Sequence, residues 1–378
     1  VEGGEWNFVL LEDLDWMEIV ETNFAVEKQI TVKSGVTATL YSGVVGDDGR
    51  EWQPITEDKD GLKRKVVKSK GGIGSIFQVY GKLTTSGVVF DGTGSNDGIA
   101  TSSGTFALEG NTLVKNFDNV AVQATAGEVR VANSVIENNI RTVIQIEGDA
   151  KLTMTESTIT NNNMTNGESV VVVASRVDNK IENCVFTNNS ATDGGAVVNK
   201  GKLTISGGKF ANNKATNGGA VANIGGKSLT INGSIGTESE VATFADTTTD
   251  IMFENNYATE KGGAIYSNSG TLEVNGVTFS GNATNIGGSG GTIAVFKTTI
   301  TITGTTIQTT YVLDESNKFK AKATNGGGLY AEGSTVNLNG GNTFTDNRAD
   351  NGGAIYILNS SISGTGDNLI SGNTATYG

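Results

Sequence analysis

The stretch Phe344-Thr345-Asp346-Asn347-Arg348-Ala349-Asp350-Asn351-Gly352-Gly353-Ala354-Ile355-Tyr356 contains a phrase that much of the chain repeats. It has an aromatic or aliphatic anchor, an Asn three residues later, and then Gly-Gly-Ala followed by an aliphatic residue. A repeat of this length decides the architecture before any site is sought. Complete copies have the anchor and Asn pairs Phe186 and Asn189, Phe210 and Asn213, and Phe253 and Asn256; degraded copies have Phe279 and Asn282, and Phe319 with Lys322 in place of the Asn.

Weaker copies extend the repeat into the first half of the chain, with anchors at Leu113 (Asn116), Ile136 (Asn139) and Ile159 (Asn162). Most anchors follow one another at 23 to 27 residues. A short alternating run such as Leu203-Thr204-Ile205 precedes each anchor, and we expect a further strand after each Gly-Gly-Ala. A helical solenoid would need long amphipathic runs, and the repeats contain none. The pattern predicts an all-β fold, a single-stranded right-handed parallel β-helix, because no six-residue subrepeat typical of left-handed coils is present.

The ends of the chain differ from the repeats. We predict that residues 1–29 form an N-terminal cap, a short helix or an irregular segment, because Leu10, Leu14 and Met17 fit one helical face and the first layer of a solenoid needs covering. Residues 30–378 are predicted to be the β-helix. A charged excursion at 46–65 has turn signals at Asp48-Gly49 and Asp60-Gly61. Residues 58–61 resemble part of a calcium loop but lack its later ligands and closing Glu, so a solvated hairpin is expected there. Since Ile370 and Asn373 open another repeat, we expect the solenoid to continue beyond residue 378.

Stacking of the coils explains the phrase. Equivalent anchors lie above one another, so Phe186, Phe210, Phe253, Phe279, Phe319 and Phe344 are expected to form an internal aromatic ladder. The repeated Asn residues, including Asn189, Asn213, Asn256, Asn282 and Asn347, are expected to form an amide ladder at a bend, where Asn tolerates left-handed backbone angles. The glycine pair turns the chain where a Cβ would clash. The phrase is therefore interpreted as a folding instruction.

Composition limits the function. The net charge is −13 without a basic run, which argues against nucleic acid and anionic membrane surfaces as partners. No apolar stretch is long enough for direct membrane insertion. The chain has no His, which removes the usual general base and the commonest transition-metal ligand. Cys184 is the only cysteine and is predicted to be a buried small hydrophobe. We predict no catalytic residues, no cofactor and no metal.

The anchor with its Asn, paired with Gly-Gly-Ala and an aliphatic residue, resembles the repeat of the polymorphic outer-membrane proteins of chlamydiae and of adhesin-like β-helix proteins of gut microbes. The resemblance covers residues 110–378 well and residues 30–110 by architecture only. It implies a bacterial protein, extracellular or on the cell surface, that acts as a non-catalytic adhesin or structural passenger. The implied partner is a host-cell, matrix or carbohydrate ligand.

An enzyme is the alternative, since right-handed β-helices also carry polysaccharide lyases and glycoside hydrolases, and those enzymes need clustered carboxylates. The outward column before the anchors is Arg130, Thr153, Thr204, Thr230, Glu273, Thr301 and Asn337, without a run of Asp or Glu. Threonine arrays also suit ice or crystalline surfaces. Here the column is single and broken by charge, so ordinary β-propensity explains it better.

Two long intervals mark where the repeat is interrupted. The excess residues lie mainly at 234–250, before Phe253, and at 305–318, before Phe319. Both intervals are assigned to the segment between the alternating run and the anchor, so both insertions are expected on one side of the solenoid, where insertions often form the binding face. Tolerated surface loops are the alternative. The candidate partner-binding residues are Glu238, Glu240, Asp246, Asp250, Tyr311, Asp314 and Glu315.

Overall fold

A computed structural model describes residues 4–10, 14–15, 29–45, 52–54, 66–69, 72–94, 96–165, 168–225, 227–233, 252–313 and 319–377. The chain divides into two compact units, Val1–Asn166 with Ala174–Asn179, and Gly167–Val173 with Lys180–Gly378. Every regular element among the described residues is a β-strand. Accordingly, the described part of the chain has no helix that is long and apolar enough to cross a membrane.

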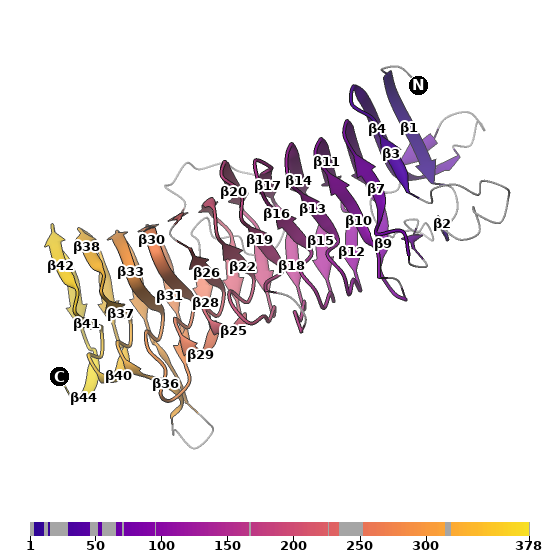
Figure 1. Cartoon of the computed structure of the whole chain (residues 1–378). Helices are drawn as coiled ribbons and strands as arrows, with labels where there is room; N and C mark the ends of the chain where they lie inside the picture. The colour runs from indigo at the N-terminus through magenta and orange to yellow at the C-terminus, as the bar shows by residue number, and fades with distance from the viewer. Residues whose placement is uncertain are drawn as a thin grey trace. The chain divides into compact units, whose positions relative to one another are not determined.

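The first unit repeats a coil of three strands, and the strands of successive coils lie side by side (Figure 1). Equivalent strands pair in parallel, as β10–β13, β11–β14 and β12–β15 do. The first strands are β3 (Ile30–Val32), β7 (Ser75–Val79), β10 (Gly98–Ser102), β13 (Val122–Ala124) and β16 (Ile144–Ile146). The second are β4 (Val36–Val45), β8 (Lys82–Ser86), β11 (Thr105–Glu109), β14 (Glu128–Ala132) and β17 (Lys151–Thr155). The third are β2 (Leu14–Asp15), β6 (Val66–Lys68), β9 (Val89–Asp91), β12 (Leu113–Lys115), β15 (Val135–Glu137) and β18 (Thr158–Thr160).

The second unit repeats the same coil and adds a short fourth strand in several coils. The first strands are β19 (Val171–Val173), β22 (Val197–Asn199), β26 (Val221–Ile224), β37 (Leu329–Glu332) and β41 (Ile355–Leu358); the second are β23 (Lys202–Ser206), β27 (Ser228–Asn232), β38 (Thr335–Asn339) and β42 (Ser361–Thr365). The bent strands β30 (Ile265–Asn275) and β33 (Ile293–Thr303) supply both positions. The anchor strands are β21 (Val185–Thr187), β24 (Lys209–Ala211), β28 (Met252–Glu254), β31 (Thr278–Ser280), β34 (Thr306–Gln308), β39 (Thr343–Thr345) and β43 (Leu369–Ser371). The short strands are β25 (Lys214–Asn217), β29 (Tyr257–Lys261), β32 (Ala283–Thr284), β36 (Phe319–Asn325), β40 (Arg348–Asn351) and β44 (Thr374–Tyr377); β20 (Asp178–Glu182) has residues of both units.

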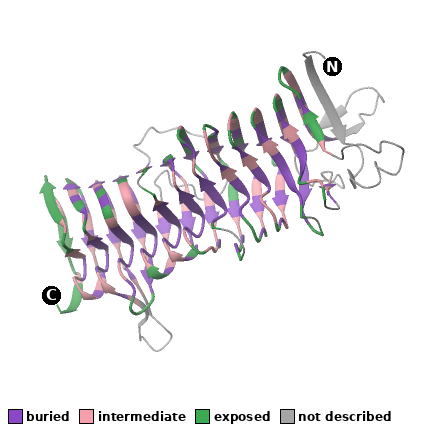
Figure 2. Ribbon diagram, viewed as in Figure 1, coloured by how far each residue is buried: buried purple, intermediate pink, exposed green. Residues whose placement is uncertain are grey.

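The parallel, in-register pairing confirms the predicted all-β parallel β-helix. In the anchor strands one residue points inward between two outward neighbours, which gives the alternating burial seen in Figure 2. Sequence alternation predicted three strands per coil correctly. Short fourth strands such as β25, β29 and β32 directly follow the Asn of the phrase and were missed, because runs of two to five residues between Asn and Gly carry no clear alternation.

The aromatic ladder is confirmed for four of its six predicted members, while Phe344 pairs with Ile307 instead of a ring. The rings of Phe186 and Phe210 are stacked with centroids 4.7 Å apart, those of Phe210 and Phe253 are 4.8 Å apart, and those of Phe253 and Phe279 are 4.9 Å apart. All four side chains are fully buried. Such stacking adds to the free energy gained by burying each ring, which is about 2–3 kcal/mol.

The amide ladder is also confirmed. The Asn213 Nδ2 donates to Oδ1 of Asn256 at 3.0 Å and to the backbone oxygen of Phe186 at 2.9 Å. The backbone N–H of Asn213 donates to the same Oδ1 at 3.0 Å. The predicted left-handed angle lies one residue earlier, however, at Asn212 with φ 56°. The fourth residue of the phrase therefore makes the ladder, and the third makes the bend. The same donor pattern links Asn189 to Asn213, Asn256 to Asn282, and Asn347 to Asn373.

The glycine pair behaves as expected. Gly218 has φ 62°, in the left-handed region that a side chain disfavours. A Cβ at Gly219 would lie 2.1 Å from the carbonyl oxygen of Gly263 in the next coil. The first glycine therefore makes the turn, and the second allows the coils to approach each other.

Two predicted anchors are wrong. In the first unit Val114, not Leu113, pairs with Phe90 on one side and Ile136 on the other. Asn116 is therefore the bend residue, with φ 61°. The apolar Leu113-Val114 pair offered two registers, and the Asn three residues after Leu113 favoured the wrong one.

In the second unit the residue between Phe279 and Phe344 is Ile307, not Phe319. Phe319 instead pairs across a hairpin with Leu313, where β36 runs antiparallel to β35 (Tyr311–Leu313). Residues 323 and 349 pair as equivalents, so Lys322 corresponds to Arg348 and not to the ladder Asn. Phe319 resembles an anchor because it is an aromatic residue, although it lies inside an insertion.

The N-terminal prediction is also corrected. The helical interpretation of residues 1–29 is wrong for the described residues, because β1 (Gly4–Leu10) is a strand that pairs in parallel with β4. The next described strand, β2, pairs with β6; Met17 lies outside the described residues. After β4 the chain pairs back in antiparallel fashion, through β5 (Trp52–Pro54). The hairpin predicted at 58–61 lies outside the described residues. Cys184 is buried, as predicted.

Candidate functional site

The repeated phrase lies inside the coils and leaves little for a ligand to touch. Phe210, Asn213 and Ala220 are each 0% exposed, and Asn256 is 1% exposed. The side-chain amides of Asn213 and Asn256 are held by their neighbours in the ladder. Candidate sites therefore lie on the outer faces of the strands and at the insertions.

The first insertion leaves the solenoid between β27 and β28, as predicted. Asn232 ends β27 and Met252 starts β28, and residues 234–250 lie outside the described residues. In the next coil the same connection consists of Gly276 and Val277 alone, between β30 and β31. The insertion is thus an addition to a two-residue turn at the N-terminal end of an anchor strand.

The second insertion leaves at a different corner. It begins after Thr310, which follows the anchor strand β34, and it returns at Lys322, whose equivalent in the next coil directly follows Asn347. Its first residues form the hairpin of β35 with β36. The expectation that both insertions share one side is therefore wrong, because the misplaced anchor at Phe319 moved the second insertion to the other end of the anchor strand.

The corrected positions place the insertions at opposite edges of one surface. Strands β28, β31 and β34 are parallel neighbours, so all their N-terminal ends lie at one edge of the sheet. The first insertion enters β28 at that edge, and the second leaves β34 at the opposite edge. The outer side of β24, β28, β31 and β34, bordered in this way, is called the framed face. Its outward residues are Lys209, Met252, Glu254, Thr278, Ser280, Thr306 and Gln308, while Ala211 of β24 is buried.

The chemistry of the framed face suits binding. Lys209 Nζ lies 2.8 Å from Glu254 Oε2, so the one carboxylate of the four strands is paired with a cation. The remaining polar groups are hydroxyls and the Gln308 amide, which donate and accept hydrogen bonds. A glycoside hydrolase needs two carboxyl groups about 5 to 9.5 Å apart, and the described residues of this face present one.

A set of cations and aromatic rings lies on the short strands beside the framed face. Lys214 Nζ lies 5.6 Å from the Tyr257 ring centroid, and the Arg348 guanidinium lies 5.3 Å from that of Tyr311. Lys322 forms an ion pair with Asp350 in the next coil. The two cation–π contacts contribute about 0.5–1 kcal/mol each at exposed sites. Lys214, Tyr257, Tyr311, Lys322 and Arg348 are together called the basic–aromatic edge.

Tyr311 is the one predicted partner-binding residue that the structure describes. It starts the β35–β36 hairpin. Lys214, Tyr257 and Arg348 were not selected from the sequence, although all three occupy the position directly after a ladder Asn. That position is the available sequence signal, since the side chain after the inward Asn reaches the surface in these three coils. Glu238, Glu240, Asp246, Asp250, Asp314 and Glu315 lie outside the described residues.

The first unit contains a buried carboxylate with a lowered pKa. Burial of Asp91 raises its pKa, but hydrogen bonds from Thr93 and Asn116 and the charge of Lys68 outweigh burial and bring the pKa to about 2. Its Oδ1 accepts from Asn116 Nδ2 at 3.0 Å and from the Thr93 hydroxyl at 2.6 Å. The arrangement ties adjacent coils together and holds the carboxylate ionised. Within the described residues, no group of three or more His, Cys, Asp or Glu side chains is placed to hold a metal ion.

Comparison with known proteins agrees with the repeat architecture. Residues 183–200, 250–268 and 343–358 match the model of the Chlamydia polymorphic membrane protein repeat. The chain carries this repeat. Each matched segment contains an anchor Phe with its Asn and Gly-Gly-Ala, so the polymorphic membrane protein repeat corresponds to the buried phrase.

The chain was also compared with curated proteins and with solved structures. No curated protein matches the chain. The A-module of the Azotobacter vinelandii mannuronan C-5 epimerase AlgE6 is similar in structure at 13% identity, covering 99% of this chain and 91% of the epimerase module, with a TM-score of 0.29. A similarity of that extent supports no conclusion about activity.

Proposed function

We propose that this chain is part of a non-catalytic passenger, extracellular or on the cell surface, that binds a host-cell, matrix or carbohydrate ligand. The observation that carries the proposal is the match of three segments to the polymorphic membrane protein repeat. The burial of that repeat supports it further, because the phrase is used for folding and recognition falls to the outer faces.

The binding surface proposed is the framed face with its two insertions and the basic–aromatic edge. Insertions at two edges of a solenoid sheet add variable side chains without disturbing the stacked core. Residues 234–250 supply Glu238, Glu240, Asp246 and Asp250, and the second insertion supplies Tyr311, Asp314 and Glu315. These residues remain the proposed partner contacts.

The test is a pair of deletions designed from the coil geometry. Removing 234–250 leaves Gly233 and Ile251 between β27 and β28, which matches the Gly276–Val277 connection of the next coil. Removing 311–321 joins Thr310 to Lys322, which matches the direct succession of Asn347 and Arg348. Each variant is assayed on a glycan array, immobilised matrix proteins and cultured epithelial cells. Loss of binding with an unchanged Tm is the expected result; full binding by both deletions would refute the proposed surface.

Catalysis is tested separately. The chain is incubated with acidic and neutral polysaccharides, and new reducing ends or unsaturated products are measured. We expect no turnover. Cleavage whose rate rises in proportion to the concentration of this protein would refute a non-catalytic passenger. This outcome does not depend on the results of the deletions.

A further inference from the structure

The outer side of the second strands in the second unit carries a regular array of uncharged polar groups. Pairing in register aligns three outward columns across β23, β27, β30, β33, β38 and β42. All outward positions but Lys202 and Glu273 are threonine, serine or asparagine. We call this surface the hydroxyl–amide face. Its columns are Lys202, Ser228, Thr271, Thr299, Thr335 and Ser361; Thr204, Thr230, Glu273, Thr301, Asn337 and Ser363; and Ser206, Asn232, Asn275, Thr303, Asn339 and Thr365.

Strand propensity accounts for the threonines of this face but not for its asparagines and serines. Threonine favours exposed strands, but asparagine is depleted in them and serine is not enriched. Asn275, Asn337 and Asn339 nevertheless occupy outward positions within regular strands. The equivalent face of the first unit is different, because Arg130 lies 3.9 Å from Glu109 and 4.0 Å from Glu128, and Lys151 lies 3.8 Å from Glu128. The same fold therefore tolerates a charged, ion-paired face, and the neutral face needs another explanation.

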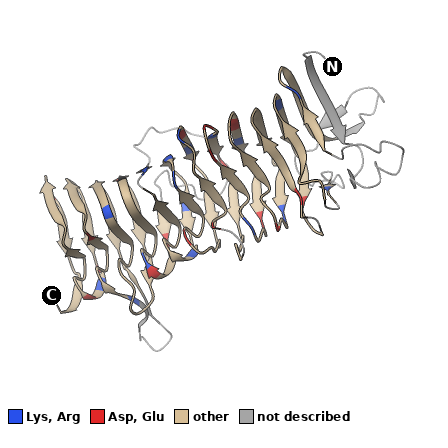
Figure 3. Ribbon diagram, in the orientation of Figure 1, with Lys and Arg blue, Asp and Glu red and all other residues tan. Residues whose placement is uncertain are grey.

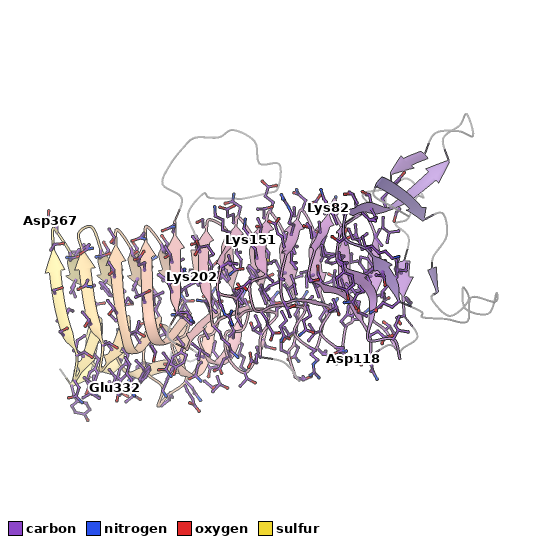
Figure 4. All side chains as sticks on the ribbon, turned by 45° about the horizontal axis from the view of Figure 1, so that its top comes forward. Lys82, Asp118, Lys151, Lys202, Glu332 and Asp367 are labelled. Atoms are coloured by element: carbon purple, nitrogen blue, oxygen red, sulfur yellow. The ribbon has the colours of Figure 1, made fainter. Side chains whose placement is uncertain are left out.

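The polar groups of the hydroxyl–amide face are held in place by one another. Asn275 Nδ2 donates to Asn232 Oδ1 at 3.0 Å, and the Ser363 hydroxyl donates to Asn337 Oδ1 at 3.0 Å. The Thr365 hydroxyl donates to Asn339 Oδ1 at 3.4 Å. Side chains fixed before binding lose less entropy when a ligand arrives. Figure 3 shows how few charged residues lie on these strands, and Figure 4 labels Lys202 at the start of β23.

We propose that the hydroxyl–amide face binds a linear, neutral polysaccharide laid across successive coils. Hydroxyl and amide groups both donate and accept hydrogen bonds, as sugar hydroxyls do. The near absence of charge disfavours an acidic or basic ligand, whose desolvation would not be compensated. The proposal depends on the proposed function only in placing the chain outside the cell, and it concerns a different surface from the framed face.

The repetition of the face favours a polymer over a single sugar. Equivalent groups recur at the strand spacing of about 4.8 Å along the solenoid and at about 6.8 Å along each strand. A polymer of repeating units meets similar donors and acceptors in each coil, so weak contacts add through effective concentration. A rigid crystalline surface fits less well, because the Glu273 carboxylate interrupts the central column. A flexible chain passes that position without loss of its other contacts.

The test uses affinity electrophoresis of the complete 378-residue chain. Native gels contain hydroxyethylcellulose, galactomannan or, as the acidic comparison, polygalacturonate. The test variant is Thr301→Val with Asn337→Val, which removes central polar groups but keeps strand-forming residues. The matched control is Thr84→Val with Thr153→Val, at the equivalent column of the first unit. A rescue variant, Thr301→Ser with Asn337→Ser, restores hydroxyls.

A neutral polysaccharide is expected to retard the unmodified chain, the control and the rescue variant. The test variant should need at least a tenfold higher polysaccharide concentration for the same retardation. The inference would be overturned by no retardation in either neutral gel, by stronger retardation in polygalacturonate, or by equal loss in the control. Deletion of 234–250 separates the two proposals, since it should abolish binding at the framed face while retardation by neutral polysaccharide persists.

Discussion

The coil of Phe253 and the coil of Ile307 have the same arrangement of strands, but only the first keeps the anchor ring and the ladder Asn of the repeated phrase. In the first, the Phe253 ring stacks on rings on both sides, at 4.8 and 4.9 Å, and Asn256 continues the amide ladder. In the second, the anchor is aliphatic, and Thr310 occupies the ladder position. Both coils carry an insertion. The insertion before the Phe253 anchor leaves the phrase intact, whereas the insertion within the phrase of Ile307 interrupts the amide ladder, which resumes between Asn347 and Asn373.

The interruption leaves two local defects. Thr309 occupies the bend with φ 53°, where Asn stands in most coils. The Oδ1 of Asn347 is buried without a hydrogen bond, because the preceding coil has no Asn to donate to it. Both defects lie where the second insertion leaves the solenoid. The added loop is therefore accompanied by a local loss of stability.

The largest predicted effect is loss of a stacked ring. Phe210→Ala should destabilise the second unit by about 3–5 kcal/mol, because it removes two stacking contacts and leaves a cavity. Ile307→Ala is the matching truncation in the interrupted coil and should cost about 2–3 kcal/mol, because no ring stacking is lost. Denaturant unfolding monitored by circular dichroism measures both. Similar values for the two variants would contradict the contrast between the coils.

Breaking the amide ladder is expected to cause the second-largest loss of stability. Asn213→Ala removes donors to Asn256 and Phe186 and the acceptor for Asn189, and should cost about 3 kcal/mol because buried partners are left unsatisfied. Thr310→Ala, at the equivalent position of the interrupted coil, loses one acceptor for the Arg348 N–H and should cost about 1 kcal/mol. A cost at Asn213 below that at Thr310 would show that the ladder is incidental.

The corner at Asp91 offers a pH-dependent counterpart to the neutral amide ladder. The pKa of Asp91 falls from its ordinary value of 3.8 to about 2 on folding. Its stabilisation is therefore complete above about pH 4 and is lost as the pH falls towards 2. Asp91→Asn should cost about 1–2 kcal/mol at pH 7 and flatten this dependence. Tm measured from pH 2 to 7 tests it. A wild-type curve that Asp91→Asn leaves unchanged would argue against the assignment.

The smallest predicted effect is a gain in stability. Thr309→Asn should stabilise the interrupted coil by about 1 kcal/mol, because a β-branched residue is strained at positive φ and Asn tolerates it. Thr306→Asn, on the outer side of β34, is the control and should bring no gain, since its backbone is extended. A lower Tm for Thr309→Asn would contradict the assigned bend.

The ladders of the second unit could be predicted from sequence because each residue type has one place in a stacked coil. Phe, Asn and Gly-Gly recur at fixed offsets, so the architecture and the stacked rings followed from spacing alone. The register failed where two residues competed for one role, as with Leu113 and Val114, and where Phe319 imitated an anchor inside an insertion. The N-terminal strand was missed because β1 is stabilised by pairing with β4, a long-range contact that local periodicity does not encode.

The candidate site was predictable only in part. The position of the first insertion followed from the intervals, but the framed face depends on the corrected anchor at Ile307. The basic–aromatic edge and the hydroxyl–amide face arise from residues of different coils, which only the pairing register brings together. If the register is wrong by one coil or one residue, a different set of outward side chains is placed side by side.

The central claim is that the phrase folds the chain and that recognition lies outside it. The most direct test compares the 234–250 deletion with Phe210→Leu, measuring Tm and binding to the glycan array, matrix proteins and cultured cells. We predict that the deletion keeps the Tm and loses at least tenfold in binding, whereas Phe210→Leu lowers the Tm and binds normally when folded. Normal binding by the deletion, together with weakened binding by folded Phe210→Leu, would contradict the account.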